Sequence, residues 1–288
     1  MLYRVRHTTT YFYEHEVALA HNRVSSQPRD TLRQECVSHH LLVEPEATGI
    51  SRYRDAFGNW LTYFTLEENL EELTITLRSD VSVQGFELPD YALTLAQARQ
   101  RPGGREDIAA QQFLFPSAHI EWDAALLEYA RLSLPEDRPL LPALLELTQR
   151  IFKDFSYTPG STNISTKVSE VLTKRKGVCQ DFAHLGVAIL RGLGMPARYV
   201  SGYLLTTPPP GKARLIGADA SHAWFSVYLP GWGWLDLDPT NNCRCNDQHI
   251  TQAWGRDYAD VAPVRGVVLG GGRQGVKVSV DVQPLVAS

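Results

Sequence analysis

The residues that could carry out nucleophilic catalysis in this chain are a cysteine, a histidine and an aspartate, in the order Cys179, His222 and Asp238. Cys179 stands where a predicted helix begins, and the exposed amide groups of a helix N-terminus favour a thiolate. That effect amounts to about 0.3–1 kcal/mol at an exposed site, and the nearby charge of Asp181 opposes it. Lowering a thiol pKa by two units takes roughly 2.7 kcal/mol, so an activated cysteine here needs a protonated imidazole beside it.

His222 is the candidate imidazole because it opens a segment with a two-residue period. The apolar residues of this segment share one face, and they are Ala223, Phe225, Val227 and Leu229. His222 therefore points to the opposite face, together with Trp224 and Ser226. This placement weighs against the alternative that His222 is an ordinary histidine of the core.

Asp238 follows from the register of a predicted hairpin. If Leu229-Pro230-Gly231 forms a three-residue loop with Gly231 in the left-handed conformation, His222 lies opposite Asp238. Directly opposed residues have Cβ atoms roughly 4.5–5.5 Å apart, which lets a carboxylate hold an imidazole. A two-residue Pro-Gly turn would move Asp238 to the other face, but the type II turn typical of Pro-Gly twists wrongly for a tight hairpin. The three residues thus form a nucleophile, a base and an orienting carboxylate.

The elements that must position these residues differ between the two halves of the chain. Residues 1–85 are rich in β-branched and aromatic residues with a two-residue period, as in His7–Tyr13 and Leu73–Leu77, which predicts a sandwich or half-barrel. The stretch Arg99–Arg105 is typical of a linker.

The second half is predicted to be helices followed by an antiparallel sheet, which makes the chain α+β. Apolar spacing predicts helices from Leu140 to near Phe155, around Val168–Leu172, and from Cys179 to Leu193. The period then changes to two, and the predicted strands are Arg198–Leu204, Ala223–Tyr228 and Trp234–Asp238. We assign residues 1–95 to an N-terminal β-sandwich-like domain, 96–135 to a linker with helical segments, and 136–288 to a catalytic core.

Composition limits the class of protein. The 288 residues carry 28 Lys and Arg against 32 Asp and Glu, a net charge of −4 without basic runs. This argues against nucleic acid or an anionic membrane as the main partner. Four cysteines are too few for a disulfide scaffold, and the first six residues lack the apolar region of a signal peptide. We therefore expect a cytoplasmic protein that does not span a membrane.

Several segments of the second half resemble the motifs of bacterial transglutaminase-like proteins. They are Lys176–Leu185, Gly194–Tyr203, Ser221–Trp224, Leu237–Asn241 and Gly255–Val261. The opening residues, from about Leu2 to Val83, resemble the β-rich N-terminal domain found beside this core in bacterial members. The resemblance implies a papain-like α+β core of helices packed on an antiparallel sheet, and a Cys179–His222–Asp238 triad.

The resemblance also implies an activity on amides. The superfamily contains amide cross-linking enzymes, peptidases, deglycosylating amidases and members without the triad. We predict a cysteine-dependent hydrolase or acyltransferase that acts on peptide or isopeptide bonds of a peptide or protein substrate, through an acyl-enzyme on Cys179. Residue 178 is Val where animal cross-linking enzymes typically carry Gln, which favours hydrolysis. The alternative is a non-catalytic peptide-binding or maturation module that retains the fold.

Two further residues are candidates for the site. Tyr157 could add a second oxyanion donor to the backbone amide of Cys179, and Trp224 could line a substrate cleft with Trp232 and Trp234. No calcium-loop motif is apparent, and no cofactor is predicted.

The remaining motifs are predicted to be structural. Gly270–Gly275 has the GxGxxG spacing, but the strand pattern Val276–Val282 follows it instead of a helix, so we expect a loop. Four residues could supply metal ligands, namely Cys36, Cys243, Cys245 and His249. Their spacing is unlike that of a zinc site, and no metal is predicted. His184 is about 140° around the helix from Cys179 and is expected to pack structurally.

Overall fold

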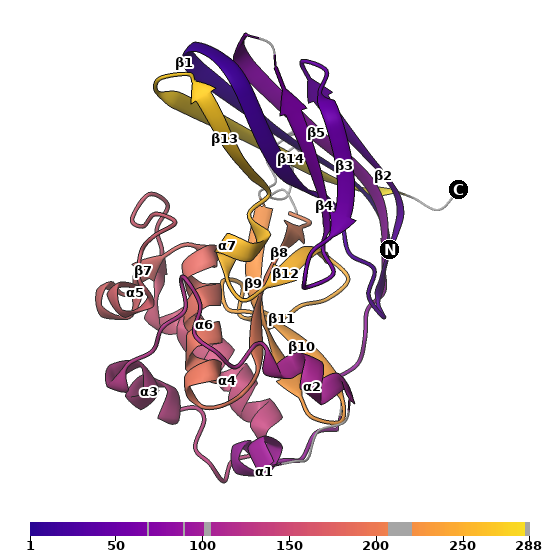
Figure 1. The fold of residues 1–288 in the computed structure, drawn as a ribbon. Coiled ribbons are helices and arrows are strands. Elements are labelled where there is room, and N and C mark those ends of the chain that lie inside the picture. Colours follow the sequence, from indigo (N-terminus) through magenta and orange to yellow (C-terminus); the bar gives the residue numbers. More distant parts are fainter. Residues whose placement is uncertain (68, 89, 101–104, 207–220, 286–288) are drawn as a thin grey trace, which may run out of the picture.

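The computed structural model describes residues 1–67, 69–88, 90–100, 105–206 and 221–285. Figure 1 shows a β-rich part, mostly indigo and violet, above an α+β part. This is the predicted α+β class with a strand-rich N-terminal region. Of the predicted linker Arg99–Arg105, residues 101–104 lie outside the described residues. No helix among the described residues is long and apolar enough to cross a membrane.

The N-terminal part is one curled antiparallel sheet organised around a very long first strand. Its strands are β1 (Leu2–Gln27), β2 (Gln34–Glu44), β3 (Thr48–Arg54), β4 (Trp60–Leu66), β5 (Leu70–Val83), β13 (Val264–Gly270) and β14 (Gln274–Leu285). The first half of β1 pairs with β5 and the second half with β4, with an irregularity between Phe12 and Val17. The sheet therefore curves, and its inner face buries a core that includes Tyr13, Phe64 and Leu73.

The last two strands belong to this sheet and not to the core in which the sequence analysis placed them. Both β13 and β14 pair with β1, and Figure 1 shows these yellow strands among the indigo ones. The assigned range 136–288 therefore takes in 22 residues or so that complete the N-terminal sheet. The reason is that Val280 and Val282 alternate with polar residues and bury their side chains beside Tyr3 and Val5. Of the predicted loop Gly270–Gly275, only residues 271–273 connect the two strands, because Gly270 ends β13 and Gln274 begins β14. Gly271 and Gly272 have positive φ angles of 84° and 63°, which suit this tight connection.

The other part contains the predicted helices and strands of the core. A sheet in the order β11-β10-β9-β8-β12 is formed by β8 (Ala197–Leu204), β9 (Ser221–Leu229), β10 (Gly233–Asp238), β11 (Cys243–Arg244) and β12 (His249–Gly255). The helices are α1 (Leu95–Gln100), α2 (Arg105–Gln111), α3 (Ala124–Arg131), α4 (Leu140–Asp154), α5 (Val168–Lys174), α6 (Cys179–Gly192) and α7 (Tyr258–Val261). The central helix α6 packs on β9 and β8 (Figure 1). Its buried face and the apolar face of β9 form the main core.

Gly186 sets the close approach of α6 to β9. A Cβ atom built at Gly186 would lie 2.4 Å from Cδ1 of the Phe225 ring. Gly186→Ala is therefore expected to lower the free energy of unfolding by about 1–3 kcal/mol, because the buried ring has no room to retreat. Gly85→Ala is the matched control, since a Cβ there meets nothing within 4 Å. Equal urea midpoints for the two variants would contradict this account of the packing.

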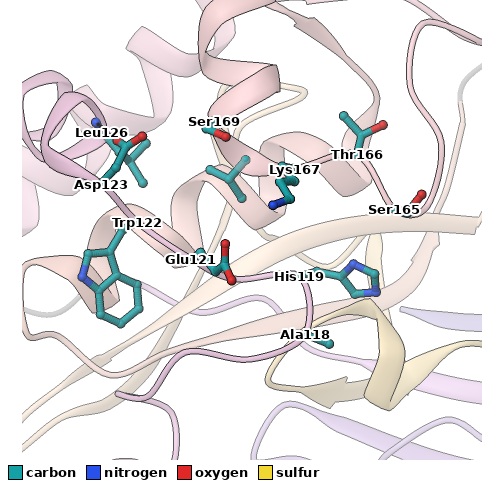
Figure 2. Close-up of a pocket in the computed structure, with 11 residues that line it drawn as sticks. Ala118, His119, Glu121, Trp122, Asp123, Leu126, Ser165, Thr166, Lys167 and Ser169 are labelled. Atoms are coloured by element: carbon teal, nitrogen blue, oxygen red, sulfur yellow. Dashed lines mark hydrogen bonds between the residues drawn. The ribbon is translucent and has the colours of Figure 1, made fainter.

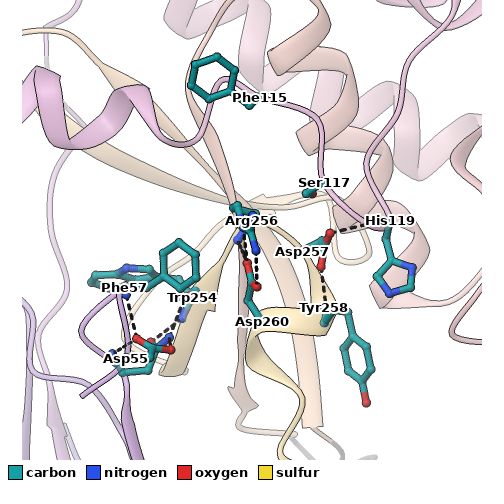
Figure 3. A network of polar contacts seen from close by, with 12 residues as sticks. Asp55, Phe57, Phe115, Ser117, His119, Trp254, Arg256, Asp257, Tyr258 and Asp260 are labelled. Atoms are coloured by element: carbon teal, nitrogen blue, oxygen red, sulfur yellow. Dashed lines mark hydrogen bonds and ion pairs between the residues drawn. The ribbon is translucent and has the colours of Figure 1, made fainter. Parts of the chain in front are cut away.

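The side-chain amides of Gln34 and Asn59 hydrogen-bond the N-terminal part of the chain to β12. The Gln34 side chain donates to the Thr251 carbonyl and accepts from the Thr251 amide, each at 2.7 Å. Asn59 does the same for Trp254, at 2.8 and 3.1 Å, and is itself held by Asp55. Figure 3 shows Asp55 and Trp254, and near them the ion pair between Arg256 and Asp260. Paired side-chain amides thus replace ladder hydrogen bonds where β12 would otherwise be an open edge.

Candidate active site

Cys179 is the first residue of α6, as predicted, and its surroundings hold the helix start in place. The short strands β6 (Ser156–Tyr157) and β7 (Lys176–Gly177) pair in parallel immediately before it. The Asp181 carboxylate accepts from the Val178 amide at 2.8 Å and from the Thr162 hydroxyl at 2.6 Å. Burial raises the pKa of Asp181 and these hydrogen bonds oppose that rise. The N–H of Cys179, as a first-turn group, has no acceptor within its own helix and can serve a ligand.

His222 joins the other two predicted catalytic residues. Its Nε2 lies 2.7 Å from Oδ2 of Asp238, and Cys179 is close enough to the imidazole to help raise the pKa of His222. Because Asp238 occupies Nε2, Nδ1 is the nitrogen that serves the sulfur. Burial disfavours the charged imidazolium, but the hydrogen bonds to Asp238 and Cys179 outweigh it and raise the pKa of His222 to about 10.

The hairpin that joins His222 to Asp238 has a different register from the predicted one. The loop has the predicted length of three residues and Gly231 has a φ of 82°, but the pairs are Leu229 with Gly233 and Phe225 with Leu237. The pairing is therefore shifted by two residues, and Asp238 would continue opposite Trp224, not opposite His222. A shift of two leaves every side chain on its original face, so Asp238 reaches His222 along the diagonal.

Asp238 is completely buried and is surrounded by hydrogen-bond donors. Oδ1 accepts from the amides of Thr240 and Asn241 at 2.9 and 3.2 Å, and Oδ2 accepts from the Asn241 side chain at 2.6 Å. Burial favours the neutral carboxyl, but the hydrogen bonds from His222 and His249 hold the pKa of Asp238 well below its usual range. The site therefore keeps a fixed negative charge behind the imidazole.

His249 is a further member of the site that the sequence analysis considered only as a metal ligand. Its Nε2 lies 3.2 Å from Oδ2 of Asp238, and its Nδ1 accepts from the Asn246 amide at 3.2 Å. The residue opens β12 and pairs with Leu204 of β8. Only this long-range strand pairing brings His249 to Asp238, so no local sequence pattern could have indicated it.

Trp224 and Tyr157 lie near the triad in different environments. The Trp224 side chain is 0% exposed and packs under His222 and His249, with ring centroids 6.1 and 5.4 Å away. It supports the two imidazoles from below, which corrects the expectation that it lines an open cleft. Tyr157 is 54% exposed, and its pKa is raised by burial and by the charge of Cys179. Tyr157 thus lies near the nucleophile, and its role as an oxyanion donor stays a prediction.

The other cysteines and histidines are placed differently from the metal-ligand quartet considered above. Ligand atoms of Asp238, Cys243 and His249 lie within 4.8 Å of one another, whereas Cys36 is in β2 and Cys245 is buried beside Trp224. His184 accepts from the Tyr258 amide at 3.2 Å, and burial lowers its pKa to about 3. It packs as a neutral side chain, as expected.

A small cavity lies away from the triad. It has a volume of about 240 Å³ and lies between the segment before α3 and the segment that enters α5. Figure 2 shows Glu121 and Lys167 among its lining side chains. None of the three triad residues lines it.

Comparisons with known proteins identify the relatives of this chain. Residues 3–82 match the bacterial transglutaminase-like N-terminal region, and residues 130–239 match the core of the transglutaminase-like superfamily. An uncharacterized protein of Mycobacterium tuberculosis H37Rv is 45% identical over 98% of this chain and 92% of its own length. An uncharacterized protein of Mycobacterium leprae is 32% identical over 98% of both chains.

Two other comparisons concern proteins with assigned activities. The protein-glutamine gamma-glutamyltransferase of Pseudomonas aeruginosa is 32% identical over 40% of this chain and 18% of its own length. A crystal structure from Cytophaga hutchinsonii, provisionally assigned as a cysteine protease, superimposes with a TM-score of 0.77 at 24% identity, covering 100% of this chain and 92% of that one. The chain therefore belongs to the transglutaminase-like superfamily, whose members are generally cysteine-dependent enzymes of amide bonds.

Proposed function

We propose that the protein hydrolyses peptide or isopeptide bonds of a peptide or protein substrate through an acyl-enzyme on Cys179. The observation that carries the proposal is the 2.7 Å hydrogen bond between His222 and the buried Asp238, with Cys179 at the start of α6 close enough to the imidazole to help raise its pKa. A pure binding module has no need of a buried carboxylate that keeps an imidazole protonated beside a thiol. The raised pKa of His222 suits this pairing, because imidazolium and thiolate stabilise each other.

The chemistry assigns one task to each group. The sulfur of Cys179 attacks the amide carbonyl, so a C–S bond forms while the carbonyl π electrons move to oxygen, and the backbone N–H of Cys179 stabilises that charge. His222 gives its Nδ1 proton to the leaving nitrogen as the C–N bond breaks, which leaves a thioester. Water then attacks the thioester and gives one proton to His222, the C–S bond breaks, and an acid is released while the Cys179 thiolate and the protonated imidazole are restored. The net reaction adds one water across one amide.

The identity of the acyl acceptor is tested by product mass. A peptide library is incubated with the protein in the presence and absence of a labelled primary amine, with Cys179→Ala as the control. We expect acid products in both incubations, little incorporation of the amine, and no products from the variant. Predominant amine incorporation would replace hydrolysis by acyl transfer, the reaction in the name of the Pseudomonas aeruginosa relative. Equal cellular activity of Cys179→Ala and the wild type would favour the non-catalytic alternative.

A further inference from the structure

A second site is indicated by a large cavity at the far end of the β9–β10 hairpin. Its volume is about 690 Å³, within the range of small-molecule and peptide-residue sites. It lies between the loop after β1, at Leu32 and Arg33, and the core sheet at Trp232 and Trp234. Tyr228, which pairs with Trp234, is six residues along β9 from His222, or about 20 Å at 3.4 Å per residue. No triad residue lines the cavity, although Asp236 at its inner end is two residues from Asp238 along β10.

Beneath the cavity, three polar residues form a row on adjacent strands, and Arg198 and Asp236, the two ends of the row, line the cavity. Ser226 of β9 pairs with Arg198 of β8 on one side and with Asp236 of β10 on the other. Their side chains are 6%, 0% and 8% exposed for Arg198, Ser226 and Asp236. Nε of Arg198, Oγ of Ser226 and Oδ1 of Asp236 each lack a hydrogen-bond partner in the described part of the chain. Unpartnered polar atoms in a buried row are costly, and a ligand in the cavity would supply partners for those of Arg198 and Asp236, which line it.

The charges around this row favour an anion. The Arg198 guanidinium is stacked against Trp234 and Trp254, 4.1 and 3.6 Å from the ring centres. A second guanidinium, that of Arg33, stands at the mouth of the cavity, 3.8 Å from Oδ2 of Asp236, too far for a hydrogen bond. Burial and the nearby charges of Arg29 and Arg33 lower the pKa of Arg198 to about 9, although the charge of Asp236 opposes this. The other acidic residue of the lining, Glu87, is exposed, so in the buried part of the cavity two guanidinium groups face the single carboxylate of Asp236 and can take a second one.

The walls of the cavity are aromatic, so a matching ligand also needs an apolar group. Trp232 is 39% exposed and contacts Phe86, which also stacks on Arg33. The matching ligand thus carries a carboxylate for the arginines, an N–H for Asp236 close to it, and a flat or bulky apolar group. The C-terminal residue of a peptide has all three within one residue.

We infer that this cavity binds the C-terminal residue of a peptide, with its carboxylate at Arg198 and Arg33, its amide N–H at Asp236 and an aromatic side chain against Trp232 and Trp234. The inference does not depend on the proposed hydrolysis, because it concerns binding alone.

The test is a calorimetric titration of the chain carrying Cys179→Ala, so that no turnover interferes. The probes are N-acetyl-L-phenylalanine and its C-terminal amide, which differ only in whether the end group is a charged carboxylate or a neutral carboxamide. We expect the acid to bind at least about tenfold more tightly than the amide. Equal affinities, or no binding of either probe, would overturn the assignment of a carboxylate site.

Variants locate the bound acid. Arg33→Ala is expected to weaken binding of the acid by about tenfold or more, while binding of the amide stays unchanged. Arg138→Ala is the matched control, because its side chain is 33% exposed against 28% for Arg33 and does not line the cavity. Arg198→Met keeps the stacked volume and should abolish the preference for the acid in a protein shown by circular dichroism to be folded. Unchanged binding in Arg33→Ala would place the acid elsewhere.

Two kinds of ligand carry such a carboxylate, a peptide with a free C-terminus and a small aromatic acid, and a longer peptide distinguishes them. A pentapeptide that ends in phenylalanine with a free carboxylate is expected to bind at least as tightly as N-acetyl-L-phenylalanine. Its C-terminally amidated form is expected to bind about tenfold more weakly. Binding of the small acid without binding of the peptide would overturn the peptide assignment in favour of a free aromatic acid.

Discussion

Iodoacetamide at pH 7 is expected to modify Cys179 at least about a hundredfold faster than Cys36 or Cys243. The reacting species is the thiolate, and Cys179 combines a helix N-terminus with the neighbouring charge of His222. Burial raises the pKa of both other half-buried cysteines to about 11, so about one thiol in 10⁴ is ionised there at pH 7. Peptide mapping after short exposure to the reagent measures the three rates separately.

Loss of this thiol should remove the activity as well. Cys179→Ala is expected to reduce amide cleavage by about 10⁴-fold or more, since removal of a nucleophile leaves only binding and oxyanion stabilisation. Cys36→Ala is the matched control, because Cys36 is also half-buried and lies in β2 of the N-terminal sheet. His222→Ala should slow the labelling of Cys179 and leave that of Cys36 unchanged. Similar labelling rates for Cys36 and Cys179 in the wild type would contradict an activated nucleophile.

Local patterns predicted the parts of the site that local physics decides. The two-residue period from Ala223 placed His222 on the face opposite the main core. In the structure Ala223 and Phe225 belong to that core, and Trp224 packs in a separate cluster on the other face. The same reasoning gave the loop length and the left-handed Gly231. The predicted register was wrong, because a pairing moved by two residues keeps the same buried face. The loop is formed by residues 230–232 and not by residues 229–231. Asp238 was identified nevertheless, because after the shift it is still the diagonal neighbour of His222 on the same face, whereas Asp236 on that face lies opposite Ser226.

Features that depend on distant segments could not be predicted in this way. The strands after Val264 alternate like strands of any sheet, and nothing within them indicates that β1 is their partner. His249 reaches Asp238 only because β12 pairs with β8. Trp232 and Trp234 line an aromatic cavity as expected, but it lies at the opposite end of the hairpin from the triad and Trp224 is not part of it.

The carboxylate of Asp238 should control the pH range in which the protein can transfer a proton. The bond to Asp238 contributes to raising the pKa of His222 to about 10, so the imidazole stays protonated through neutral pH and loses its proton as pH rises through about 10. Acylation needs that proton for the leaving nitrogen, and its rate should fall over the same interval. Without the carboxylate charge the pKa of His222 falls, by about 1–3 pH units for a lost ion-pair partner. Asp238→Asn should therefore move the alkaline limb of the acylation profile to lower pH by a similar amount.

The same substitution should also lower the maximal rate by about 10²–10⁴-fold, because an amide cannot satisfy the surroundings of Asp238. Both carboxylate oxygens accept from donors, the backbone amides at Oδ1 and the Asn241 side chain and imidazoles at Oδ2, so either orientation of an Asn side chain would set an NH₂ group against an N–H. Asp257→Asn is the matched control, since Asp257 is 1% exposed and accepts from His119 and Ala259, away from the triad. It should lower the free energy of unfolding and leave the alkaline limb in place. If the limb moves equally in both variants, or in neither, the imidazolium is not held by Asp238, and the 2.7 Å contact would be a structural hydrogen bond without a part in proton transfer.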